Sequence, residues 1–83
     1  MKFRTEIDIM PLKSLLDPQG KAISASMKNV GLSEIKNVRV GKHITLEIEV
    51  DDEEVAALKI EEACKKMFCN QIMESFNFTL EKV

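Results

Sequence analysis

Residues 41–54 read GKHITLEIEVDDEE, and this stretch decides the fold. Apolar and polar residues alternate without interruption over Ile44–Asp51, which is the period of a strand with one solvated face. The preceding Gly41-Lys42 is the glycine-first dipeptide that a tight β-hairpin prefers. The acidic residues that follow suit the N-cap and first turn of a helix. The stretch therefore predicts a hairpin strand that leads directly into a helix.

Toward the C-terminus the period becomes helical. Asp51 or Asp52 is expected to cap a helix that ends near Asn70, a residue suited to a left-handed terminator. The apolar stripe of this helix consists of Ala56, Ile60, Ala63, Cys64 and Met67. Alternation then returns at Phe76, Phe78 and Leu80, and predicts one more strand.

Toward the N-terminus three further elements are expected. Ile35–Val40 reads as the strand on the other side of the hairpin. A helix is expected over residues 18–30, because Asp17-Pro18 fits an N-cap followed by proline at the first helical position. Gly31 fits the C′ position that ends this helix, with Leu32 packing back on it. Alternation from Phe3 predicts a first strand, which Pro11 ends.

The element order is therefore βαββαβ in one α+β domain that spans residues 1–83. The apolar residues of all four strands share one face, so we expect a two-layer sandwich with both helices on that face of a four-stranded antiparallel sheet. Right-handed crossovers favour the ferredoxin-like order 4-1-3-2, with the first and third strands central.

Composition excludes several classes of function. Lys and Arg total 12 against 14 Asp and Glu, a net charge of −2, which lacks the basic excess that nucleic-acid binding needs. No apolar run is long enough for a signal peptide or a membrane span, so a soluble cytoplasmic protein is expected. A core this small gives the isolated domain only marginal stability, and we expect oligomerisation to add to it.

The candidate catalytic residues have competing interpretations. Cys64 and Cys69 are either small apolar helix residues or a nucleophile paired with His43, and burial habits favour the first. Their spacing sets them about 140° apart on an α-helix, so no disulfide is expected. The acidic run 51–54 either binds a cation or forms the first turn of a helix, and the helix is the simpler and favoured interpretation. No zinc-type spacing is present.

Phosphate chemistry has little support in the sequence. An acylphosphatase-like enzyme needs a glycine-rich, arginine-bearing loop before the first helix, and residues 10–17 contain neither glycine nor arginine. Residues 17–20 either present helix N–H groups to an anion or form a cap with a glycine for close approach. The sequence is compatible with both.

The loop over residues 10–16 is apolar but follows neither period. Apolar residues that a monomer cannot bury mark contact with another chain, and open edge strands invite sheet extension across a dimer. The residues alone thus predict a non-catalytic assembly module.

Several motifs together resemble one family over essentially the whole chain. They are Lys13 followed by Leu16-Asp17-Pro18-Gln19-Gly20, then Gly31, Val38-Arg39-Val40-Gly41-Lys42, and Cys64 with Asn70, Ile72 and Glu74. The chain is similar to the PurS family, the small subunit of phosphoribosylformylglycinamidine (FGAM) synthase in purine biosynthesis. Gln71 departs from the family pattern, which usually has proline there.

The resemblance implies a three-component ligase. A glutaminase subunit (PurQ) releases ammonia, and a synthetase subunit (PurL) uses ATP and Mg to place it on formylglycinamide ribonucleotide (FGAR), while the small subunit bridges them as a homodimer or dimer of dimers. No catalytic residue, cofactor or metal is expected on this chain. A ligand-sensing regulatory domain of the same topology is the alternative.

The expected interface with partners or other copies combines the leucines of the apolar loop with residues of the family motifs. It consists of Leu12, Lys13, Leu15, Leu16, Asp17, Gln19, Arg39, Lys42, Asn70 and Glu74. Arg39 and Lys42 flank the hairpin turn without an evident intrachain role. We therefore expect them to meet acidic groups of a partner, or else to be solvated charges.

Overall fold

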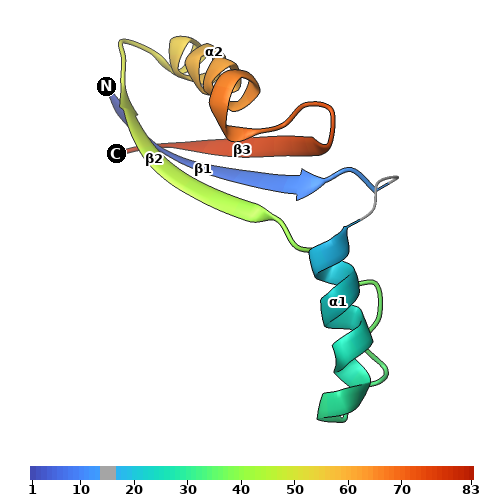
Figure 1. The fold of residues 1–83 in the computed structure, drawn as a ribbon. Coiled ribbons are helices and arrows are strands. Elements are labelled where there is room, and N and C mark those ends of the chain that lie inside the picture. The colour runs from blue at the N-terminus through green and yellow to red at the C-terminus, as the bar shows by residue number, and fades with distance from the viewer. Residues whose placement is uncertain (14–16) are drawn as a thin grey trace.

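The chain folds around a three-stranded antiparallel sheet (Figure 1). This computed structural model describes residues 1–13 and 17–83. The strands are β1 (Lys2–Pro11), β2 (Lys42–Glu49) and β3 (Glu74–Lys82), in the order β2-β1-β3. β1 is central, and its Ile7 pairs with Ile44 on one side and Phe78 on the other. The predicted pairing of the first strand with the third and fourth is confirmed.

The first helix ends as its sequence predicts. α1 (Pro18–Ser26) continues into a 3-10 turn at Met27–Val30 and stops at Gly31, whose φ is +80°. The Leu32 N–H donates to the Met27 carbonyl at 3.0 Å, and the Gly31 N–H donates to the Lys28 carbonyl at 3.3 Å. These two bonds form a Schellman motif, in which glycine takes the left-handed position at low steric cost.

The second helix covers the apolar face of the sheet (Figure 1). α2 (Glu53–Ala63) begins after Asp52, whose Oδ1 accepts the Val55 N–H at 2.9 Å, and its Ile60 packs with Ile7 and Ile9 of β1. Partly buried side chains of β2 and β3 complete the core: Ile44, Leu46, Ile48, Phe76, Phe78 and Leu80. No helix in residues 1–13 or 17–83 is long and apolar enough to cross a membrane.

The prediction of four strands is wrong, because Ile35–Val40 is not a strand. The N–H groups of Val38 and Val40 donate to side chains of Ser24 and Asp17, not to a neighbouring strand. The segment therefore runs along α1, no hairpin forms at Gly41, and β2 is at an edge of the described sheet.

The prediction that both helices cover one face is also wrong. Only α2 lies over the sheet, whereas α1 projects beyond its end (Figure 1). We call residues 18–40 the arm. No arm residue belongs to the hydrophobic core that the described residues form.

A π-helical turn at Cys64–Phe68 corrects the predicted stripe of the second helix. The Cys69 N–H donates to the Cys64 carbonyl at 2.9 Å, so the turn holds one residue more than an α-helical turn. Met67 is consequently 81% exposed rather than in the core. Cys64 and Cys69, which an α-helix would direct apart, are both buried in the same cluster as free thiols.

Candidate functional site

Asp17 organises the N-terminal end of α1. Its Oδ1 accepts the Gly20 N–H at 3.0 Å and its Oδ2 accepts the Val40 N–H at 3.0 Å. These bonds, first that from Gly20 and then that from Val40, hold the pKa of the Asp17 carboxyl below its usual value. Asp17 is therefore both the N-cap of the helix and the tie that holds residues 38–40 beside it.

Close approach of this segment depends on Gly20. A Cβ at position 20 would collide with the Val38 carbonyl oxygen and lie 2.7 Å from Asp17 Oδ2. The Val38 N–H donates to Ser24 Oγ at 2.9 Å one turn further along the helix. The cap with a close-approach glycine, one of the two readings of residues 17–20, is thus present in the structure.

Arg39 has an intrachain contact that the sequence did not indicate. Its Nη2 donates to the Pro11 carbonyl at the end of β1. The contact ties the arm to the sheet and fixes the direction of the guanidinium group.

The turn before β3 gathers three of the predicted interface residues. Glu74 Oε1 accepts the Asn70 N–H at 2.8 Å, and its Oε2 lies 3.8 Å from Lys42 Nζ. Lys42 Nζ also donates to the Phe68 carbonyl at 3.3 Å. The expectation that Lys42 lacks an intrachain role is therefore wrong, because it joins the start of β2 to this turn.

The predicted interface residues fall into two groups. Lys13, Asp17, Gln19 and Arg39 lie around the N-terminal end of α1, while Lys42, Asn70 and Glu74 form the turn cluster. Leu12 joins the second group through its N–H, which donates to the Met73 carbonyl at 2.9 Å. Leu15 and Leu16 lie outside the described residues.

Sequence reasoning missed three residues at the first group. Lys21, Ser24 and Asn37 line the same cavity as Lys13 and Arg39. They come together because the extended segment packs on α1 at Gly20. The glycine of the cap was the one signal in the sequence for this packing.

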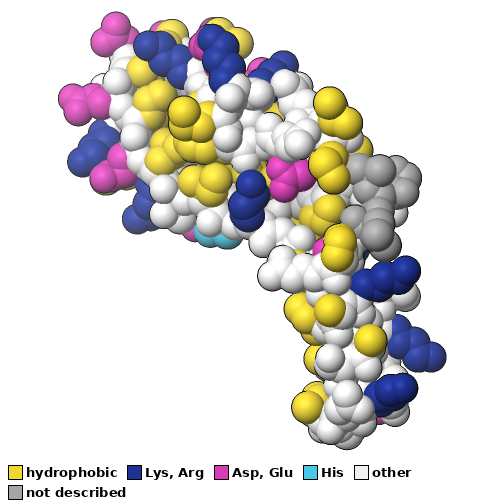
Figure 2. Space-filling model, viewed as in Figure 1, with side chains coloured by type: hydrophobic (Ala, Val, Ile, Leu, Met, Phe, Trp, Pro, Cys, Tyr) yellow, Lys and Arg dark blue, Asp and Glu magenta, His cyan; other side chains and the backbone are white. Residues whose placement is uncertain are grey.

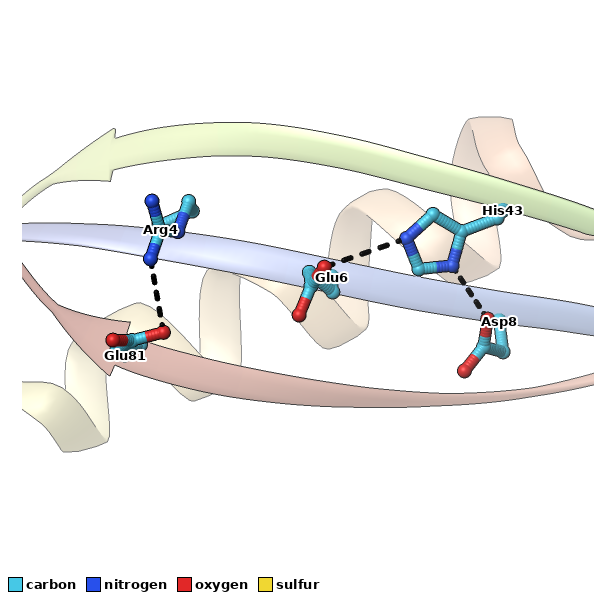
Figure 3. Close-up of polar contacts among 5 residues, drawn as sticks. All are labelled: Arg4, Glu6, Asp8, His43 and Glu81. Atoms are coloured by element: carbon cyan, nitrogen blue, oxygen red, sulfur yellow. Dashed lines mark hydrogen bonds and ion pairs between the residues drawn. The ribbon is translucent and has the colours of Figure 1, made fainter.

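The solvated face of the sheet carries a line of polar contacts (Figure 3). His43 Nδ1 lies 2.6 Å from Asp8 Oδ1 and Nε2 lies 3.7 Å from Glu6 Oε1. The hydrogen bond to Asp8 raises the pKa of His43, against a smaller opposing effect of desolvation. Arg4 Nη2 donates to Glu81 Oε2 at 3.1 Å on the same face.

This arrangement separates His43 from the thiols. The exposed His43 belongs to the solvated face, whereas Cys64 and Cys69 are buried under the apolar face with α2. Burial raises the pKa of both thiols and disfavours the thiolate. In the described residues Cys64 and Cys69 therefore pack in the core, and neither is placed as a nucleophile with His43 as its base. No group of three or more His, Cys, Asp or Glu residues within 1–13 and 17–83 is arranged to hold a metal ion.

Comparison with known proteins gives one consistent family. The family model described as PurS, phosphoribosylformylglycinamidine (FGAM) synthase, matches residues 4–82. Subunit PurS of phosphoribosylformylglycinamidine synthase from Mycobacterium leprae is 34% identical over 80 residues, 94% of this chain and 95% of that protein. The Bacillus subtilis subunit of the same name is 30% identical over 81 residues, with 98% and 95% covered.

The fold agrees with this match. A chain in the structure of PurLQS from Thermotoga maritima superposes with a TM-score of 0.88 at 26% identity, covering 98% of this chain and 99% of that one. The sequence comparison and the structure comparison thus lead to the same family of proteins. This chain belongs to the PurS family of phosphoribosylformylglycinamidine synthase subunits.

Proposed function

We propose that this chain is the non-catalytic small subunit of a cytoplasmic, glutamine-dependent FGAM synthase. It joins a glutaminase subunit (PurQ) to a synthetase subunit (PurL) and supports the transfer of ammonia between them. In this proposal the synthetase, not this chain, uses ATP and Mg to convert FGAR to FGAM. Family membership supports the assignment, as does the likeness to a chain from a structure named PurLQS.

The observation that carries a role in assembly, rather than in catalysis, is the exposed apolar surface of the arm. Val30 is 66% exposed, and Leu32 and Ile35 are 43% and 41% exposed. Figure 2 shows hydrophobic side chains along one side of the arm and basic ones along the other. Apolar surface that projects beyond its own core is suited to contact with another chain.

The positions of the thiols and the histidine support the assignment of the chemistry to partner subunits. A cysteine nucleophile needs a low pKa and a base within reach, whereas these thiols are buried and lie on the other face from His43. The turn cluster and Gln19 then serve docking, through the exposed side chains of Gln19 and Asn70.

Reconstitution tests this proposal. The chain is mixed with the synthetase and glutaminase subunits of its own organism, and glutamine-dependent FGAM formation is measured with and without it. We expect turnover only in the three-component mixture, co-purification of all three proteins, and neither glutaminase nor ATPase activity of the chain alone.

The variant Cys64→Ala with Cys69→Ala provides the second test of the proposal. Because the thiols act in packing, the folded double variant should support turnover at the wild-type rate. Loss of turnover with an unchanged circular dichroism spectrum would contradict the non-catalytic assignment, as would hydrolysis of glutamine by the isolated chain.

A further inference from the structure

An open cavity of about 420 Å³ lies between α1 and the segment that runs beside it. Three cationic residues line it: Lys13 follows β1, Lys21 belongs to α1, and Arg39 precedes β2. Positive charge from three separate parts of the chain thus converges on one hollow. This is unusual in a protein whose net charge is −2.

Among the described residues the cations of the cavity face one carboxylate, that of Asp17, whose pKa the charge of Arg39 helps to lower. No ion pair there joins Lys13, Lys21 or Arg39 to a carboxylate. Asp17 is the one acidic residue among the described lining residues, and its two oxygens accept the N–H groups of Gly20 and Val40. Three cations and one carboxylate leave an excess of two positive charges.

The remaining polar lining consists of groups that can donate hydrogen bonds. Ser24 Oγ accepts the Val38 N–H, which leaves its own O–H free to donate into the cavity. Asn37 lines the same space with an amide that carries two N–H donors. Arg39 is held by one donation to the Pro11 carbonyl, and its other N–H groups remain for a ligand. The site is rich in donors, and the one carboxylate among its described lining residues is already engaged.

We propose that this cavity binds the phosphate groups of a small molecule. Phosphate oxygens only accept, guanidinium binds them in a bidentate manner and lysine supplies point charges, which matches the lining described. The volume lies in the range of small-molecule sites, roughly 300–1,000 Å³. A single partner carboxylate would satisfy only part of the excess charge. The diphosphate chemistry could come from free pyrophosphate or from a nucleoside diphosphate.

Such a site is independent of the bridging role and would make the subunit responsive to a metabolite. Calorimetry on the full chain at about 0.15 M salt, first with pyrophosphate and then with metal-free ADP, tests it. We expect saturable binding, and we expect Lys21→Ala with Arg39→Ala to weaken it about tenfold or more, because two charge-assisted contacts are lost. Tighter binding of ADP would identify a nucleotide, and equal affinity would identify the diphosphate group alone as the ligand.

The arm offers a matched control. Lys28→Ala with Lys36→Ala removes the same two charges from a neighbouring hollow that those residues line. At about 0.15 M salt the affinity of this variant should stay within about twofold of wild type, because Lys28 and Lys36 do not line the proposed site and exposed charges are screened over about 8 Å. In the wild-type protein, NMR shifts induced by pyrophosphate should concentrate on Lys13, Lys21 and Arg39, a readout that needs no variant to fold.

Three results would overturn the proposal. The first is no binding of either probe to the wild type. The second is equal weakening in both double variants, which would indicate non-specific attraction to the arm. The third is a wild-type chain that does not bind pyrophosphate, together with loss of partner assembly in the Lys21, Arg39 variant but not in the Lys28, Lys36 variant. That result would identify an acidic side chain of a partner as the occupant of the cavity.

Discussion

His43 is the single histidine of the chain, so one NMR titration reports on it without overlap. Its pKa is raised in the folded state chiefly by the hydrogen bond to Asp8. A raised folded pKa means that the stabilisation is complete below the unfolded value of about 6.5 and is lost as the pH rises through the folded value. The protonated His43 therefore stabilises the fold under mildly acidic conditions.

Replacing Asp8 tests this assignment. Asp8→Asn should lower the pKa of His43 toward about 6.5, and should reduce the pH dependence of stability between that value and the folded pKa. Glu81→Gln is the matched control, because it removes one negative charge from the same face but contacts Arg4. Equal shifts of the His43 pKa in the two variants would show that general surface charge, not the Asp8 contact, sets it.

At the scale of elements, sequence periodicity predicted the three strands and α2, whose neighbours lie in the main core. β1, β2 and β3 alternate cleanly, and the caps at Asp17 and Asp52 start the helices where expected. The segment Ile35–Val40 has the same alternation, yet its half-buried valines rest against α1. Alternation reports that one face is covered and does not report which element covers it.

The π-helical turn shows a second limit of periodicity. The 3.6-residue period places Met67 in the stripe with Cys64, but the added residue turns Phe68 toward the core instead. The candidate site shows a similar limit. Residues 17–20 predicted the helix cap. Lys21 and Asn37 line the cavity only because two segments that are distant in sequence pack together, which no local pattern indicates.

Gly20→Ala tests the packing of the arm. The added methyl group meets a backbone carbonyl that cannot rotate away, and overpacking of this kind costs about 1–3 kcal/mol. Alanine gains about 1 kcal/mol of helix propensity over glycine, so we expect a net loss of stability in the arm. The measurement is amide hydrogen exchange at Val38 and Val40, which should become faster.

The control for this prediction is Gln19→Ala, a change at the exposed neighbouring position of the same helix. It should leave exchange at Val38 and Val40 unchanged. If Gly20→Ala retains wild-type protection at both amides, the segment does not depend on close approach at Gly20.

The whole molecule is far from compact. Its radius of gyration is 16.5 Å, against about 12 Å for a compact domain of this length. Its accessible surface is 6174 Å², against about 5000 Å² for a compact monomer of 9.4 kDa. The excess surface comes with the exposed apolar residues of the arm, and a second copy of the chain is the natural cover for it.

We therefore expect at least a dimer in solution, held through the arm. Light scattering at micromolar concentration should give a dimer mass or higher, and Val30→Glu with Ile35→Glu should reduce it to the monomer. Leu58→Glu with Met67→Glu replaces two exposed apolar side chains of the α2 region and should leave the dimer intact. A monomeric wild type, or equal dissociation by both variants, would contradict an arm-mediated dimer.

The central position of β1 has a consequence for synthesis. β1 pairs with β3 from Phe3 with Lys82 to Pro11 with Glu74, so the first strand to leave the ribosome waits for the last of the three. Pairings between distant segments close slowly, because loop entropy must be overcome first. Until β3 emerges, the nascent chain carries one unpaired edge of β1 beside Ile7 and Ile9, a surface on which chaperones would act.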